Sequence, residues 1–233
     1  MYIQWWDEVE EPQEGKGFME QSEKECSQLI NLAKPRMERS LVSAQNTNWE
    51  GVVSSRRTSS GRFLAKGQNQ LVRRIEKRIA EFTFIPVENG EGLSILHYEV
   101  GQKFEPHHDY THPDSFSFKS LGQRNATLVM SGVKEGGATV FPEAKKCASS
   151  ARRWWKKLPE YGKDNGLSVK PKMGDALLFW SVKPDGTLDP TSLHASSPVV
   201  KGDKWVGVKL MHVKAKDLTQ EVMANRCRST SNR

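Results

Sequence analysis

Two histidines and one aspartate are the residues in this sequence whose types and spacing best suit metal chemistry. His107 and Asp109 are two positions apart, so on a β-strand both side chains would project from the same face. His194 would complete a set of two imidazoles and one carboxylate, which suits iron(II) and leaves about half of its octahedral positions open. Lys204 follows ten residues later and could pair with an anionic co-substrate. This pattern favours an iron(II)- and 2-oxoglutarate-dependent oxygenase.

Two amphipathic helices are expected in the N-terminal part of the chain. The first starts at Ser22, because Ser22 and Glu25 fit a capping box, and Pro35 kinks or ends it. Residues 40–61 are rich in Ser, Asn, Thr and Gly, which predicts a loop or an irregular hairpin. The second helix ends before Pro86 and buries one apolar face. That face is formed by Leu71, Val72, Ile75, Ile79 and Phe82.

After Gly90 the spacing of apolar residues changes from helical to alternating, which predicts β-strands. The clearest candidates are residues 93–98, 126–130, 176–180 and 205–211. Helices followed by many short strands indicate a mainly β protein. A double-stranded β-helix (jelly roll) braced by the N-terminal helices is the natural architecture for holding a metal in its mouth.

This pattern predicts three parts along the chain. Residues 1–21 form an N-terminal extension, and residues 22–213 form a single domain whose jelly-roll core spans about 91–213. Residues 214–233 form a polar, basic tail.

Composition excludes some classes of function. The chain has 233 residues, a formal charge of +7 and 36% hydrophobic residues, which allows one domain with a sizeable core. Basic residues surround Trp154 and Trp155 between Lys145 and Lys157. A solvated loop is favoured there over a nucleic-acid site, so no nucleic-acid partner is expected.

Neither a membrane anchor nor a leader is expected in this chain. No apolar run approaches the length of a membrane span, and the N-terminal residues lack the basic start and apolar stretch of a signal peptide. The three cysteines are Cys26, Cys147 and Cys227. Three is too few for a framework of several disulfides, although one bridge and one free thiol stay open.

Longer motifs surround the candidate metal ligands and are more specific than any single residue. They are RTSSG at 57–61, EGLSILHY at 91–98, EGGATVFP at 135–142, KMGDALLFW at 172–180 and LDPTSLH at 188–194. With these motifs in order from about Lys24 to Val213, the chain resembles the catalytic domain of prolyl 4-hydroxylases of the plant and algal type. These enzymes are Fe(II)- and 2-oxoglutarate-dependent dioxygenases.

The resemblance implies roles for the residues of the site. The iron ligands are His107, Asp109 and His194. Lys204 matches the lysine that pairs with the distal carboxylate of 2-oxoglutarate, and Tyr98 matches a tyrosine that hydrogen-bonds the same carboxylate. Lys209 matches a different family position, and His108 should point to the opposite strand face. Dioxygen and ascorbate complete the implied set of cofactors and co-substrates.

The implied substrate is a proline-rich peptide that is hydroxylated at ring position 4, with succinate and CO2 as co-products. Such a peptide arrives as a preformed polyproline II helix, so ordering it costs little entropy. Residues that match the peptide groove of the family are Arg57, Ser59, Arg124 and His212. Relatives of the plant type reside in the endoplasmic reticulum and Golgi, which gives the expected localisation.

Three departures from the family pattern leave the metal ligands and Lys204 untouched. Leu210 stands where the family usually has an aromatic residue that packs on the peptide, and Thr111 replaces another frequent aromatic residue. Ser197 replaces a frequent cysteine, so a disulfide of plant and algal relatives is absent. Two alternatives therefore stay open: an oxygenase of the same class acting on another residue or one specific protein, and a peptide-binding module without catalysis.

Overall fold

The computed structural model describes residues 3–5, 23–43, 51–111, 122–144, 166–170 and 172–213. Most of the N-terminal extension, the C-terminal tail and the basic run around Trp154 and Trp155 lie outside these ranges. Ser22, Cys147 and Cys227 lie outside them as well, whereas Cys26 lies within the first helix.

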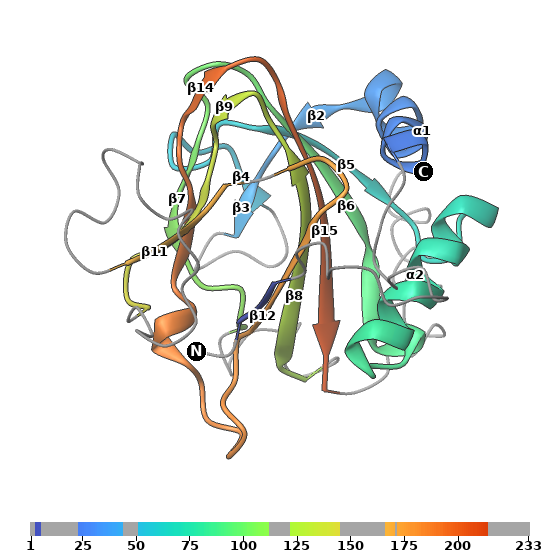
Figure 1. Ribbon diagram of the computed structural model, residues 1–233, viewed down its shortest axis with the longest axis vertical. Helices are drawn as coiled ribbons and strands as arrows, with labels where there is room; N and C mark the ends of the chain where they lie inside the picture. Colours follow the sequence, from blue (N-terminus) through green and yellow to red (C-terminus); the bar gives the residue numbers. More distant parts are fainter. Residues whose placement is uncertain are drawn as a thin grey trace, which may run out of the picture.

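Two antiparallel sheets form a double layer of β-structure, with both helices on one side of it (Figure 1). The larger sheet contains, in spatial order, β1 (Ile3–Trp5), β12 (Ala176–Trp180), β8 (Arg124–Gly132), β15 (Lys204–His212), β6 (Gly90–Tyr98), β5 (Ser60–Leu64) and β2 (Glu38–Arg39). The smaller sheet contains β11 (Leu167–Val169), β10 (Thr139–Phe141), β13 (His194–Ser196) and β7 (Phe104–His107). The mainly β, jelly-roll prediction is confirmed.

Two short strand pairs accompany the sheets. β14 (Val199–Lys201) pairs with β9 (Glu135–Gly136), and β3 (Val42–Ser43) pairs with β4 (Gly51–Val52). The second pair is the irregular hairpin expected within residues 40–61.

The two predicted helices are present. α1 spans Glu23–Ala33 and passes into the 3-10 helix η1 (Lys34–Arg36), in agreement with an end set by Pro35. α2 spans Gln70–Thr83, and the side chain of Asn69 caps it by accepting from the backbone N–H of Val72. Short 3-10 helices η2 (Val87–Asn89) and η4 (Pro190–Ser192) follow. Over the described ranges, every helix is too short or too polar to cross a membrane.

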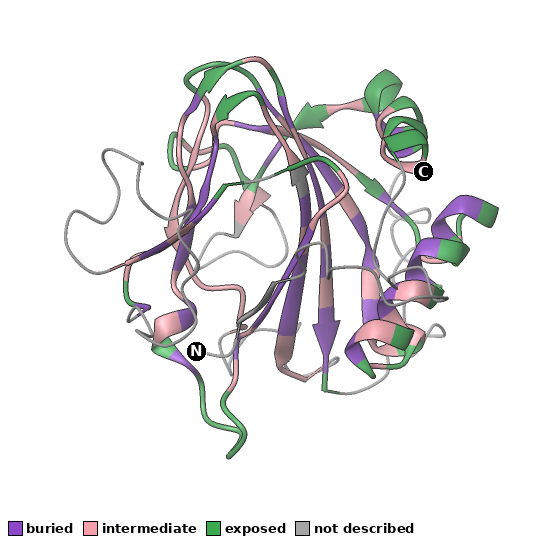
Figure 2. Cartoon of the chain, viewed as in Figure 1, coloured by how far each residue is buried: buried purple, intermediate pink, exposed green. Residues whose placement is uncertain are grey.

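Alternation along the strands gives the larger sheet two faces with different partners. Leu93 of β6 and Leu128 of β8 face the helices and belong to one apolar cluster with Ile75 of α2. On the opposite face, Phe179 of β12 meets Phe141 of β10 edge to face at 5.1 Å, which joins the two sheets. Figure 2 shows α2 buried toward the sheet and exposed on its outer side. The space between the sheets is thus closed by apolar packing at one end.

One ion pair is buried on the helix face of the larger sheet. Nζ of Lys209 lies 2.7 Å from Oε1 of Glu76 in α2, and both side chains are almost inaccessible to solvent. Lys209 follows Lys204 by five residues, so the two lysines project from opposite faces of β15. Burial lowers the pKa of Lys209, and the carboxylate of Glu76 opposes that shift. The pair ties α2 to the sheet.

Replacement of Glu76 by alanine is expected to lower the free energy of unfolding by about 3–5 kcal/mol, because Lys209 would be left buried without its partner. Urea unfolding followed by circular dichroism measures the loss. Glu81→Ala is the matched control, since Glu81 of the same helix pairs with Lys77 at 3.7 Å on the surface and should contribute less than about 1 kcal/mol. Equal losses in the two variants would contradict a stabilising role for the buried pair.

Candidate metal centre

Strand pairing brings His107 and His194 together. β7 ends at His107, β13 begins at His194, and the two residues are opposite each other in an antiparallel pair. Asp109 lies beyond the end of β7, whereas His107 is the last residue of that strand. The aspartate is instead held by Thr127 of β8, whose hydroxyl donates to Oδ2 at 2.7 Å.

The three predicted ligands converge on one point. Nε2 of His107 lies 3.7 Å from Oδ1 of Asp109, and Nε2 of His194 lies 3.5 Å from Oδ2. One donor atom of each residue lies within 4.8 Å of the other two. Residues far apart in the sequence therefore form a single His-Asp-His cluster.

Backbone carbonyls set the orientation of both imidazoles. Nδ1 of His107 donates to the carbonyl of Glu105 at 2.8 Å, and Nδ1 of His194 donates to that of Ser192 at 3.0 Å. A carbonyl can only accept, so the proton is on Nδ1 and the lone pair of Nε2 faces the centre of the cluster. Ring contacts add to this, because Phe104 stacks on His107 at 3.6 Å between centroids.

Electrostatics keep His107 and Asp109 in the protonation states that metal binding needs. Burial and the neighbouring His194 hold the pKa of His107 well below its usual value. Burial alone would raise the pKa of Asp109, but the two imidazoles and the Thr127 hydroxyl outweigh burial and lower it. A neutral imidazole at His107 and an ionised carboxylate at Asp109, together with the ring nitrogen of His194, fit the donor set of a non-haem iron(II) site.

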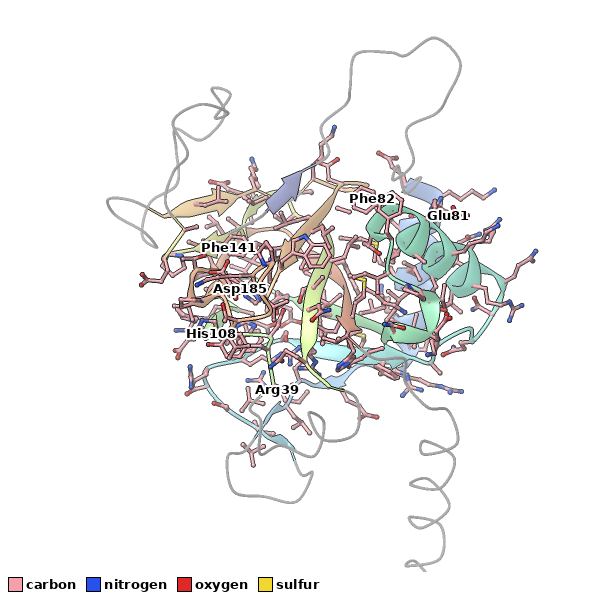
Figure 3. All side chains as sticks on the ribbon, turned by 90° about the horizontal axis from the view of Figure 1, so that it is seen from below. Arg39, Glu81, Phe82, His108, Phe141 and Asp185 are labelled. Carbon is pink, nitrogen blue, oxygen red and sulfur yellow. The ribbon has the colours of Figure 1, made fainter. Side chains whose placement is uncertain are left out.

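His108 is not part of the cluster, as predicted from the sequence. Its Nε2 bonds to the carbonyl of Pro190 at 3.2 Å, and its ring stacks on Tyr110. Figure 3 shows His108 on the same side of the molecule as Phe141, away from Phe82 of α2.

A pocket of about 610 Å³ extends from the cluster between the two sheets. Lys204 of β15 is the charged residue of its inner wall and is only 1% exposed. Its Nζ donates to Oγ of Ser196 at 2.8 Å and lies 5.4 Å from the ring centroid of Tyr98. Tyr98 is the residue of β6 that pairs with Lys204. Lys209, by contrast, lies on the other face of the sheet. The structure therefore separates the two lysines as the sequence predicted.

Burial determines the protonation of the inner wall. It lowers the pKa of Lys204 to about 7, because no carboxylate among the described residues neutralises the ammonium group. Burial also raises the pKa of Tyr98, although Arg57 and Ser59 oppose that shift, so the phenol keeps its proton. The inner wall can thus offer an anion one titratable ammonium and one hydroxyl donor.

A β-bulge directs a carboxylate into the mouth of the pocket. Lys209 pairs with Leu93 and Met211 pairs with Gly90, so two residues of β6 oppose the single residue Leu210. The extra residue turns Glu91 to the pocket face, where its Oε1 accepts from Nε of Arg124 at 2.8 Å.

The Glu91 carboxylate stays ionised in this position. Burial opposes ionisation, but hydrogen bonds from His212 and Arg124 bring the pKa of Glu91 down to about 2. Arg124 also donates to the backbone carbonyl of Asp109 at 3.4 Å, which links the mouth to the cluster.

The four residues predicted to line the groove divide into two pairs. Arg57 and Arg124 line the pocket, and Nε of Arg57 is buried without a hydrogen-bond partner within the described part of the chain. Ser59 and His212 do not line it, and here the prediction needs correction, because their side chains are buried behind the wall. Ser59 bonds to Ser40 and His212 bonds to Glu91, so both support the wall from behind.

Sequence reasoning missed three supporting residues: Thr127, Glu91 and Ser196. Thr127 is a polar residue at an alternating position of an apolar strand, which is a usable signal. Glu91 opens one of the matched motifs, but the bulge that aims it leaves no trace in the hydrophobic pattern. Ser196 reaches Lys204 only because the fold brings β13 close to β15, and no local sequence pattern indicates this contact.

Comparison with known proteins agrees with this geometry. The family model described as "2OG-Fe(II) oxygenase superfamily" matches residues 93–212. The chain is 57% identical over 194 residues to "Probable prolyl 4-hydroxylase 10" of Arabidopsis thaliana, covering 82% of this chain and 66% of that protein. It is 43% identical over 204 residues to "Prolyl 4-hydroxylase 2" of the same plant, covering 87% and 67%. The chain thus spans about two thirds of the length of these relatives.

A solved structure shows the same fold. The viral collagen prolyl hydroxylase of Paramecium Bursaria Chlorella virus-1, in complex with 2OG, superposes with a TM-score of 0.61 and 25% identity. The match covers 91% of this chain and 96% of the viral one.

Replacement of Thr127 by valine is expected to weaken metal binding about 10- to 100-fold, because Asp109 would lose the hydroxyl that orients its carboxylate. Titration calorimetry with Mn(II), which is not readily oxidised, measures the dissociation constant directly. Thr139→Val is the matched control, since Thr139 lines the same pocket from β10. A Thr127→Val protein that folds and binds Mn(II) like the wild type would refute the positioning role.

Proposed function

Because this chain belongs to the prolyl 4-hydroxylases within the 2OG-Fe(II) oxygenase superfamily, we propose that it hydroxylates peptidyl proline to 4-hydroxyproline in proline-rich proteins. The observation that carries the proposal is the His-Asp-His cluster facing the buried Lys204 across one pocket. The cluster would hold Fe(II), and 2-oxoglutarate and dioxygen are the co-substrates of the family. Bound iron supplies the redox chemistry that couples oxidative decarboxylation of 2-oxoglutarate to hydroxylation of a C–H bond.

The inner wall suits the co-substrate. A 2-oxo acid that reaches the cluster with its keto end would extend its distal carboxylate toward Lys204. The ammonium group would then gain the negative partner that it lacks among the described side chains, and the protonated Tyr98 could donate a second hydrogen bond. Apolar residues such as Leu96 and Val206 line the intervening wall and exclude water from the reacting groups.

The mouth suits an extended peptide. Arg57 lines it, and its guanidinium group could donate to a peptide carbonyl, because a polyproline II helix leaves its carbonyls free. Arg124 of β8 donates to Glu91 of β6, and Leu210 belongs to β15, the strand between these two. Ser59 and His212 would act through Tyr98 and Glu91 rather than by touching the peptide.

A second candidate is an oxygenase of the same class whose substrate is one specific protein or another residue. The side chain that favours it is Leu210, because its aliphatic surface in the mouth is less selective for the flat proline ring than an aromatic side chain. Turnover on poly-proline, collagen-like and extensin-like peptides distinguishes the two candidates.

The central test is mass spectrometry of proline-rich peptides incubated with the protein, Fe(II), 2-oxoglutarate and ascorbate. Hydroxyproline and succinate are expected in equal amounts from the wild type. His194→Ala should abolish both, because it removes one of the three metal-binding groups. His97→Gln is the control, since His97 stacks on Trp205 outside the pocket. Coupled turnover that survives in His194→Ala would overturn the proposal.

Binding of 2-oxoglutarate is expected to weaken as pH rises above about 7. Below that pH Lys204 is already protonated, whereas above it a proton must be taken up with the anion, so affinity falls by about tenfold per pH unit. The fall ends at the higher pKa that the bound carboxylate imposes on Lys204. Calorimetry on the Mn(II)-loaded protein from pH 6.5 to 9 measures it.

Lys204→Met separates this effect from the titration of other groups. The variant should bind 2-oxoglutarate weakly, and the pH dependence above should disappear. A slope that persists in the variant would assign the proton to another residue.

A further inference from the structure

Side chains on four neighbouring strands of the larger sheet lead outward from the metal cluster to an aromatic residue. Thr127 of β8 touches Asp109 and pairs with Leu210 of β15. Leu210 lies opposite the β6 bulge that carries Glu91, and the next strand is β5, which carries Phe63. Phe63 itself pairs with Ser94, whose partners across the sheet are Val208 and then Val129, so Phe63 is offset from the level of Thr127 by two residues along the strands.

Phe63 faces the pocket and is accessible from its mouth. The adjacent Leu64 is 1% exposed and packs in the core beneath the helices, so the side chain of Phe63 points to the opposite face. Phe63 lines the same pocket as the metal cluster and keeps 47% of its surface exposed. A large apolar side chain that is half exposed at the mouth of a binding pocket offers surface to a ligand.

Gly92 explains how the ring is held. A Cβ added at Gly92 would lie 2.6 Å from Cζ of Phe63 and 2.3 Å from the carbonyl oxygen of Leu64. The far end of the ring therefore lies over the backbone of Gly92, which has no side chain. The ring thus lies across β6 and does not project fully into solvent. A ring fixed in this way loses little conformational entropy when a ligand packs on it.

We propose that Phe63 is a contact surface for proline-rich peptides, at a site remote from the proline that is hydroxylated. The inference rests on the proposed function and names a substrate contact within it. Proline-rich segments dock on aromatic side chains because the pyrrolidine ring is flat and apolar and the polyproline II helix is preformed.

Strand spacing gives the position of this contact along the peptide. From Thr127 to Phe63 the sheet is crossed from β8 over β15 and β6 to β5, and three spacings of about 4.8 Å, combined with an offset of two residues or about 7 Å along the strands, make about 16 Å. A polyproline II helix rises about 3.1 Å per residue, so about 16 Å corresponds to about five residues. Phe63 thus contacts long substrates and is out of reach of short ones.

The test compares two peptides, each with a single unmodified proline. One carries two 4-hydroxyprolines on each side of it, and the other carries six. Phe63→Leu is expected to raise both the KM and the dissociation constant of the long peptide about 3- to 10-fold, which is the range of an aromatic packing contact. The values for the short peptide and kcat for both peptides should not change, and Phe63→Tyr should restore wild-type values.

Phe84→Leu is the matched control, because Phe84 is 91% exposed beyond α2 and does not line the pocket. The inference would be overturned if Phe63→Leu left the KM and the dissociation constant of the long peptide unchanged, or if it raised them equally for the long and the short peptide. Fluorescence anisotropy with labelled peptides gives the dissociation constants independently of turnover. A wild type that binds the long peptide without hydroxylating it would refute the proposed function alone, whereas one that binds neither peptide would refute both.

Discussion

The position of β15 between β6 and β8 is the constraint on which the rest of the structure depends. This strand is paired along nearly its whole length on both sides, so the face that each of its residues takes is set by two registers at once. Lys204 is thereby held inside the pocket, Lys209 is held against α2, and Leu210 is held at the mouth. A shift of one residue would exchange these environments and would bury the wrong ammonium group on each side.

The two buried lysines show how the same fold separates stability from function. Lys209 has its carboxylate partner inside the protein, so its charge is neutralised in the folded chain. Among the described residues, Lys204 has only a hydroxyl and an aromatic ring within reach, which leaves a desolvated ammonium group without a negative partner there. Buried cations without counter-charges are costly, and proteins keep them where a ligand supplies the missing charge. The inner wall is therefore organised for an anion rather than for packing.

Much of this arrangement was readable from the sequence, and the failures have physical causes. His107, Asp109 and His194 could be grouped because metal chemistry restricts the residue types and the ordered motifs along the chain match a known family. The strands β7 and β13, which carry the two histidines, were not among the predicted strands. The support of Asp109 was not readable, because β7 stops before it and Thr127 comes from a distant strand. Ser59 and His212 were placed on the groove surface by motif alone, since motifs locate residues along the chain but not the depth of their side chains.

The bulge in β6 makes the number of residues in this strand as important as their identities. The segment from Gly90 to Leu93 contains one residue more than the segment of β15 that pairs with it, Lys209 to Met211. A deletion there would restore regular pairing and rotate the carboxylate of Glu91 toward the helices. On that face the buried Lys209 is already paired with Glu76, so it would not be free to pair with Glu91. Related sequences that keep this pocket should therefore tolerate substitutions in β6 far better than any change in its length. An alignment gap at this point would mark a protein whose pocket mouth is built differently.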